Sequence, residues 1–169
     1  MALHLTPQEM LARLVAFPTV STESNLELVD FVEDYLDGHG VACHRVPDAT
    51  GEKAALFAVV GPQDAPAVGL SGHTDVVPVE GQPWTNDPFT LSKCEGRLYG
   101  RGAVDMKGFD AIALALVPEM VAADLKRPIA IALSYDEEIG CFGAPPMIQA
   151  MLGAFPKPEA VIVGEPTEM

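Results

Sequence analysis

The stretch AVGLSGHTD, residues 67–75, begins as an apolar run and ends in a histidine and an aspartate. Two later stretches have the same form: IAIALSYDEE, residues 129–138, ends in three acids, and AVIVGE, residues 160–165, ends in one. Short apolar runs bounded by polar residues and glycine predict strands. Helical patterns lie between these runs. The sequence therefore predicts an α/β fold, with a mostly parallel open sheet flanked by helices.

Helices and further strands are predicted on both sides of these runs. Thr6-Pro7-Gln8-Glu9 combines a capping residue, a proline and an acid, which is typical of a helix start. Apolar residues at helical spacing, such as Leu28, Val32 and Tyr35, indicate a second helix. From such patterns we expect helices over residues 7–16, 24–36, 105–124 and 142–152, and further strands over residues 41–46, 54–60 and 97–99.

Composition and charge argue against several classes of function. The 169 residues suffice for one domain with its own core. A formal net charge of −14 repels phosphate backbones and anionic lipids, so we expect neither nucleic acid nor a membrane as a partner. The apolar runs are too short to span a bilayer, MALHLTPQEM at the start is unlike a secretory leader, and three cysteines suggest no disulfide framework. We therefore expect a cytoplasmic protein.

The polar residues that end the three apolar runs are the candidate site. Parallel strands end at one edge of a sheet, and ligands bind beyond that edge. His73 and Asp75, the acids Asp136 to Glu138, and Glu165 would then converge on one cleft. Taken singly, a histidine after a strand is more often a surface residue, and loop acids are more often solvated. The coincidence at three strand ends favours a site.

Clustered carboxylates repel one another, so a site of this kind needs cations. Histidine nitrogen and carboxylate oxygen are zinc ligands, and two divalent ions can share one carboxylate. Asp75 could hold the second ring nitrogen of His73, and one of Glu137 and Glu138 could act as a general base while the other binds metal. Asp105 lies at an expected helix start, which favours a negative group. A phosphate-binding loop and a nucleophile elbow are both missing.

Five motifs occur in order along the chain: SGHTDVVPV (residues 71–79), PW and DPF (within residues 83–89), LYGRGAVDMKGF (98–109), YDEEIGCFGA (135–144) and VGEPT (163–167). Together they resemble the motifs of the zinc-dependent amidohydrolases that include acetylornithine deacetylase, succinyl-diaminopimelate desuccinylase, aminoacylase and glutamate carboxypeptidase. Within that family, the sequence is most similar to the deacetylase branch.

The resemblance implies a role for each candidate residue and a cofactor of two divalent metal ions. Zn²⁺ is the expected metal, and Co²⁺ is the alternative. It also implies a cis peptide bond after Asp105. It assigns His73 and Glu165 to the first metal, Glu138 to the second, Asp105 to a bridge between them, Asp75 to orienting His73, and Glu137 to the general base. The implied reaction is hydrolysis of a small N-acyl amino acid. The leading candidate substrate is N-acetylornithine, which would give ornithine and acetate in arginine biosynthesis.

Members of this family are much longer, and continue into a lid and dimerisation domain before a return segment that supplies a last histidine ligand. We therefore expect residues 1–169 to be the N-terminal part of the catalytic domain, without that lid and return segment, and with little or no activity alone. The longer form is expected to be a homodimer. Two alternatives remain open: a desuccinylase, aminoacylase or carboxypeptidase, and a non-catalytic metal-binding fragment that needs a complementing chain.

Overall fold

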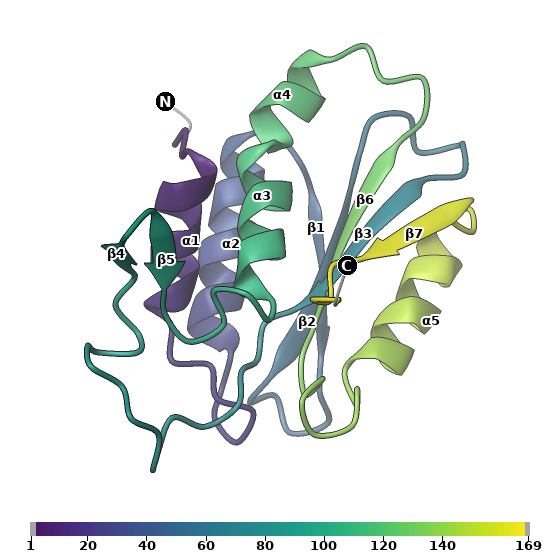
Figure 1. The fold of residues 1–169 in the computed structure, drawn as a ribbon. Helices are drawn as coiled ribbons and strands as arrows, with labels where there is room; N and C mark the ends of the chain where they lie inside the picture. The colour runs from purple at the N-terminus through teal and green to yellow at the C-terminus, as the bar shows by residue number, and fades with distance from the viewer. Residues whose placement is uncertain (1–2, 168–169) are drawn as a thin grey trace.

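The computed structural model describes residues 3–167. Residues 1–2, which begin the stretch MALHLTPQEM, and residues 168–169 lie outside the described residues. Five strands form the main sheet in the order β1-β2-β6-β3-β7 (Figure 1). The elements in chain order are α1 (Pro7–Val15), α2 (Leu26–Gly38), β1 (Cys43–Pro47), β2 (Ala54–Val60), β3 (Val68–His73), β4 (Ser92–Cys94), β5 (Arg97–Tyr99), α3 (Lys107–Ala115), α4 (Val117–Ala122), β6 (Ile129–Ser134), α5 (Ala144–Ala154) and β7 (Ala160–Val163).

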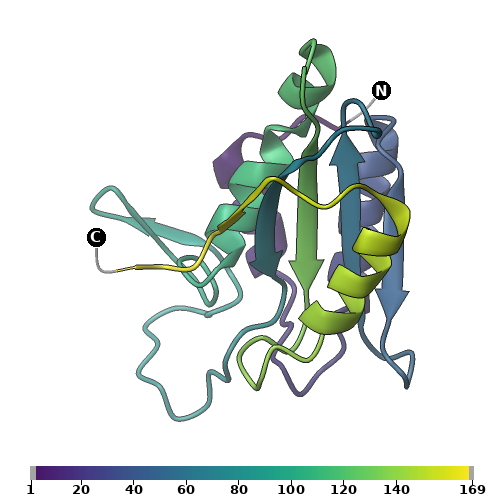
Figure 2. The same ribbon diagram turned by 90° about the vertical axis from the view of Figure 1, so that its right-hand side faces the viewer.

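The sheet is mostly parallel, which confirms the predicted fold class. β3 pairs in parallel with both β6 and β7, whereas β2 pairs antiparallel with β1 and with β6. Four strands therefore share one direction, and β2 runs against them (Figure 2). In the registers, His73 is opposite Ser134 and Ser71 is opposite Val163, so the three runs that carry the candidate residues end at the same edge.

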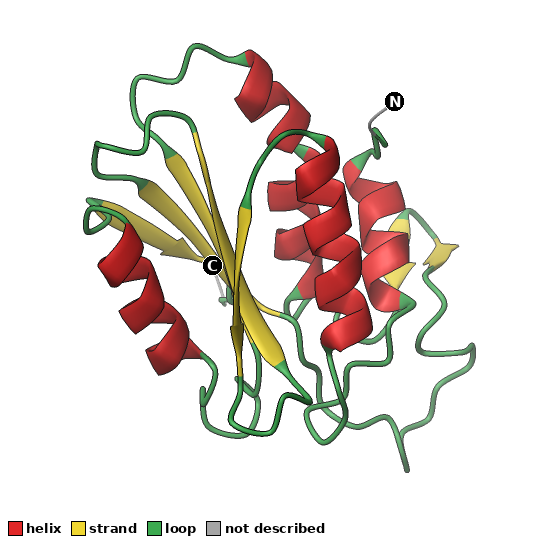
Figure 3. Ribbon diagram, turned by 180° about the vertical axis from the view of Figure 1, so that it is seen from behind, coloured by secondary structure: helices red, strands yellow, loops and turns green. Residues whose placement is uncertain are grey.

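Helices cover both faces of the sheet. The helices α1, α2 and α3 lie on one face and α5 lies on the other (Figure 3). Successive residues of β2 alternate between the two: Leu56 and Ala58 pack with the three helices, and Phe57 and Val59 pack with Met147 and Met151 of α5. Because both faces of β2 are buried, its sequence is apolar throughout, as predicted.

The N-terminal start of α1 follows its sequence signal. The backbone N–H of Thr6 donates to Glu9 Oε2 at 2.8 Å, and the Thr6 hydroxyl accepts from the backbone N–H of Glu9 at 3.3 Å. This reciprocal pair is a capping box. Pro145 and Pro146 lie in the first turn of α5, as predicted.

The prediction of one helix over residues 105–124 is wrong. Two helices, α3 and α4, replace it and meet at Leu116. Pro118 lies in the first turn of α4, where its missing N–H breaks no helical hydrogen bond. A proline inside a continuous helix would remove such a bond, and this explains the break. None of the helices within residues 3–167 has the length and apolar character needed to cross a bilayer.

Candidate metal centre

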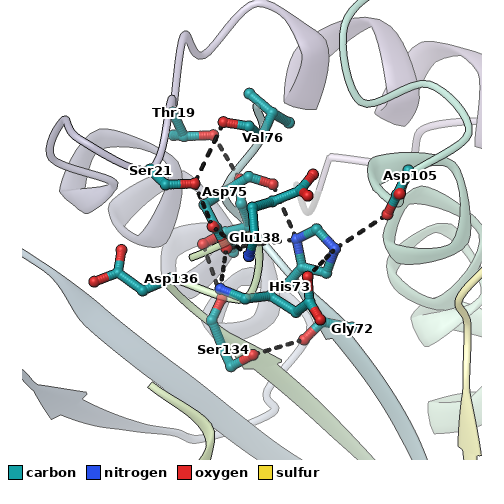
Figure 4. A network of polar contacts seen from close by, with 12 residues as sticks. Thr19, Ser21, Gly72, His73, Asp75, Val76, Asp105, Ser134, Asp136 and Glu138 are labelled. Carbon is teal, nitrogen blue, oxygen red and sulfur yellow. Dashed lines mark hydrogen bonds and ion pairs between the residues drawn. The ribbon is translucent and has the colours of Figure 1, made fainter. Parts of the chain in front are cut away.

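The structure brings the predicted residues together at the carboxyl edge of β3, β6 and β7. His73 is the last residue of β3 and is 1% exposed. Its Nε2 lies 3.2 Å from Asp105 Oδ1, 3.6 Å from Glu165 Oε1 and 3.8 Å from Glu137 Oε2. Figure 4 shows the imidazole pointing toward Asp105, which comes from the turn before α3. One buried nitrogen thus faces acids from three different segments.

Two groups of donors around His73 could each hold an ion. One is His73, Glu137 and Glu165, and the other is His73, Asp105 and Glu138, with donor atoms within 4.8 Å of one another in each. A nitrogen with carboxylate oxygens is a donor set that suits zinc and several other divalent metals. Asp105 falls in the group with Glu138, and the bridging role predicted for it stays a prediction.

Asp75 lies behind His73, where it was expected. The Nδ1 of His73 is 2.9 Å from the backbone oxygen of Asp75 and 3.4 Å from its Oδ1. The Asp75 carboxylate also accepts from the backbone N–H groups of Glu137, at 3.0 Å, and Glu138, at 3.3 Å. Asp75 is therefore placed to fix the tautomer of His73 and the path of the acidic turn together.

Electrostatic coupling in the centre is strong. Burial opposes protonation of His73, but the hydrogen bond and charge of Asp75, with the charges of Asp110 and Glu165, outweigh it and raise the pKa of His73 to about 9. Burial also raises the pKa of Glu165 and of Glu138, and nearby acids add to this effect. Such crowding of negative groups is relieved by cations.

The peptide bond between Asp105 and Met106 is cis, as the resemblance implied. Met106, His73, Glu137 and Glu165 help to line a cavity of about 190 Å³. Cys141 lines it as well, with Sγ 3.4 Å from Glu137 Oε1. Cys141 is an exposed free cysteine.

Two buried ionisable residues of α3, Lys107 and Asp110, were missed by the sequence analysis. Lys107 is fully buried and its Nζ donates to the backbone oxygens of Leu14, at 3.0 Å, and Phe17, at 2.8 Å. Burial lowers the pKa of Lys107 to about 7, and burial raises the pKa of Asp110 to about 8. Asp110 Oδ1 has no hydrogen-bond partner among the described residues. The only signal in the sequence was that these two ionisable residues lie three positions apart on one helix.

The connection between α1 and α2 was also missed. Thr19, Ser21 and Asn25 are buried, although small polar residues in a row are typical of an exposed loop. The Thr19 hydroxyl donates to the backbone oxygen of Thr74, and Asn25 Nδ2 donates to Thr74 Oγ1 at 2.9 Å. A parallel bridge joins Val20 to Val76. This connection therefore lies against the chain that carries His73 and Asp75 (Figure 4).

A mostly parallel sheet with two three-donor groups at its carboxyl edge defines a metallohydrolase domain. Residues 69–169 match the profile of Peptidase family M20/M25/M40. The chain belongs to this family.

Named relatives agree with this assignment. The chain is 40% identical over 164 residues to an acetylornithine deacetylase of Myxococcus xanthus, and 36% identical over 169 residues to one of Shigella sonnei (strain Ss046). These alignments cover 94% and 95% of this chain but 41% and 43% of the two relatives, so it spans about two fifths of their length. The fold is similar to that of an M20 family metallo-carboxypeptidase, Sso-CP2 of Sulfolobus solfataricus, with a TM-score of 0.80 at 21% identity, covering 95% of this chain and 37% of that one.

Proposed function

We propose that this domain hydrolyses the amide bond of a small N-acyl amino acid with the help of two divalent metal ions. Zn²⁺ is the first candidate for these ions, and Co²⁺ is the alternative. N-acetylornithine is the first candidate substrate, and ornithine and acetate are the products. The observation that carries the proposal is the pair of donor groups that share His73, with Glu137 in one of them. The likeness to two acetylornithine deacetylases supports the choice of substrate.

The donor set fits divalent ions in kind. When bound there, such ions lower the pKa of water and polarise a carbonyl oxygen. Glu137 is about one-third exposed, so its carboxylate can reach a water molecule in the cavity. We assign Glu137 the removal of a proton from the attacking water and its transfer to the leaving amine nitrogen. Asp75 holds His73 and the backbone of Glu137 in place during both transfers.

We further propose that residues outside these 169 complete the ligand set and enclose the substrate. Both groups depend on the same histidine, which leaves Asp105 and Glu138 as the carboxylates for a second ion. Two carboxylates are few for a tight site, because zinc takes four ligands in most proteins. The share of the relatives' length that this chain covers supports the same proposal. A cytoplasmic location and a homodimer of the longer form stay predictions.

Metal stoichiometry and product release test the proposal together. The purified chain is dialysed against buffered zinc and analysed for bound metal, with His73→Ala as the control. Because we expect little or no activity from these 169 residues alone, release of ornithine from N-acetylornithine is compared with release of diaminopimelate from its N-succinyl derivative in a longer form of the protein that includes the completing residues. Zinc bound through His73, with ornithine as the faster product, supports the proposal. Preference for the succinyl compound points to a desuccinylase, bound zinc without hydrolysis points to a metal-binding fragment, and no bound zinc contradicts the metal centre.

A further inference from the structure

We propose that Ser21 is a positioning residue of the metal centre, because its hydroxyl fixes the carboxylate of Asp75 and, through it, both His73 and the acidic turn at Glu137. The inference rests on the proposed metal centre and extends it to the connection between α1 and α2. The hydroxyl of Ser21 contacts none of the candidate ligands, so its influence has to pass through Asp75.

The contact between Ser21 and Asp75 is short and buried. Ser21 Oγ donates to Asp75 Oδ2 at 2.6 Å, and the two residues are 3% and 2% exposed. The backbone N–H of Ser21 donates to the backbone oxygen of Val76 at 3.1 Å. The parallel bridge between Val20 and Val76 holds the same stretch in register. The hydroxyl of Ser21 is thus aimed at Asp75 by the backbone contacts that Val20 and Ser21 make with Val76.

Loss of the hydroxyl would leave Asp75 under-supported. Its Oδ2 would keep the backbone N–H of Glu138 at 3.3 Å, a longer contact than the one removed. A buried carboxylate oxygen that loses a donor carries an uncompensated desolvation cost, so Asp75 is expected to rotate toward other donors. Rotation would release His73 Nδ1 on one side and the backbone of Glu137 on the other. Both donor groups contain His73, so both would be affected.

A second contact of Ser21 reaches the same acidic turn. Its backbone oxygen accepts a hydrogen bond from Lys53 Nζ, and Lys53 also pairs with Asp136, the residue before Glu137. Asp136 has a φ of 56°, an unusual conformation for a residue other than glycine. Ser21 is therefore connected to this turn by its side chain through Asp75 and by its backbone through Lys53. Only the first route depends on the hydroxyl.

Ser24 supplies a control in the same connection, on an exposed side chain. Its hydroxyl donates to the backbone oxygen of Glu52 at 2.6 Å and accepts from the backbone N–H of Leu26 at 3.2 Å. Ser24→Ala therefore removes two hydrogen bonds, as many as Ser21 Oγ makes with Asp75 and with the backbone oxygen of Val76, but it removes none that reaches the centre. A general loosening of the connection would appear in both variants, whereas an effect on Asp75 would appear only in Ser21→Ala.

The first measurement is zinc affinity by competition with a chromophoric chelator. Groups that directly hold a ligating histidine contribute about 10–100-fold to metal affinity, and Ser21 acts one contact further out, so we expect Ser21→Ala to lose about 10-fold. Ser24→Ala should bind zinc as the wild type does. In an Asp75→Ala background, which leaves no acceptor for the hydroxyl, Ser21→Ala should cause no further loss, because the hydroxyl acts through that carboxylate. Ser21→Cys keeps the shape of the side chain with a weak donor, and replaces Ser21→Ala if that variant does not fold.

The second measurement needs no metal. Amide hydrogen exchange of Glu137 and Glu138 in the metal-free protein should be faster in Ser21→Ala than in Ser24→Ala. Unchanged zinc affinity and exchange in a folded Ser21→Ala protein would overturn the inference and leave the metal centre standing. Equal losses with and without the Asp75 carboxylate would overturn it too. A wild-type chain that binds no zinc refutes the proposed function, and the exchange rates then decide the role of Ser21.

Discussion

His73 is the residue on which both donor groups depend, and its protonation controls whether a metal can bind. With a pKa of about 9 in the metal-free chain, the imidazole carries a proton at neutral pH. A metal ion needs the neutral ring, so binding must release that proton. The acids that would attract a metal cation therefore also stabilise the proton on His73, which competes with the metal.

The apparent zinc affinity should rise with pH because of this competition. The folded pKa of His73 lies above its ordinary value of 6.5, so the proton is held up to about pH 9. Between pH 6.5 and 8.5 we expect about a tenfold gain in affinity per pH unit, the slope for one released proton. Titrations in buffers of different ionisation enthalpy measure that proton directly. A flat profile would show that His73 is already neutral in the free chain.

Glu137 should be separable from metal binding by substitution. Glu137→Gln keeps the shape of the side chain but cannot accept a proton, so turnover should fall by about 10²–10⁴-fold in whichever form of the protein hydrolyses the substrate. The amount of bound metal should stay the same, because the backbone contact to Asp75 and the other donors remain. Glu119→Gln, on the exposed side of α4, is the control. Near-normal turnover of Glu137→Gln would remove Glu137 from the mechanism.

At the scale of elements, sequence patterns predict strand bounds well where local residues mark the ends of the strand. β2, β5 and β7 have the predicted bounds, because continuous apolar residues or flanking glycines delimit them. The patterns fail where tertiary contacts decide. Lys107 and Asp110 are buried by packing against α1 and β3, and Thr19, Ser21 and Asn25 are buried because they meet the chain after β3. No local sequence pattern predicts the elements against which these residues pack.

The contact between α3 and β3 makes Gly72 sensitive to substitution. A Cβ at Gly72 would lie 2.0 Å from Asp110 Oδ1 and 3.2 Å from Met106 Cε. Gly72→Ala should therefore displace α3 and lower the free energy of unfolding by about 1–3 kcal/mol, as overpacking does. Urea unfolding measures this loss.

Gly153→Ala is the matched control for that measurement. Gly153 lies in α5, and a Cβ there would meet nothing within 4 Å. Alanine favours the helix by roughly 0.5–1 kcal/mol over glycine, so this variant should be neutral or more stable. Equal stability of the two variants would mean that the Asp110 carboxyl moves aside at no cost.

At the scale of the whole molecule, β7 stands out as an edge strand with apolar residues on both faces. Val161, Ile162 and Val163 are each more than half exposed, and β7 pairs with β3 on its inner side. Within residues 3–167 no strand pairs with its outer side. Exposed edges of this kind promote association between chains, whereas a net charge of −14 opposes it. The motifs indicated the strand but not its exposure, which depends on what lies beside it.

Association through this edge should be reduced by one charge. Ile162→Lys places an ammonium on β7, and we expect it to lower the fraction of oligomer in sedimentation velocity at high protein concentration. Val121→Lys, at an exposed apolar position of α4 away from the sheet edge, should change little. A wild-type chain that stays monomeric at every concentration would contradict the expectation that the β7 edge promotes association between chains.

The link from Ser21 through Asp75 to Glu138 also has a consequence for the order of events during synthesis. Ser21 precedes Asp75 by 54 residues, and Asp75 precedes Glu138 by 63. At roughly 5–20 residues per second, the N-terminal connection leaves the ribosome several seconds before Asp75, and several more pass before the acidic turn follows. Metal capture by nascent chains would therefore begin late, and would mark the moment at which the three segments have met.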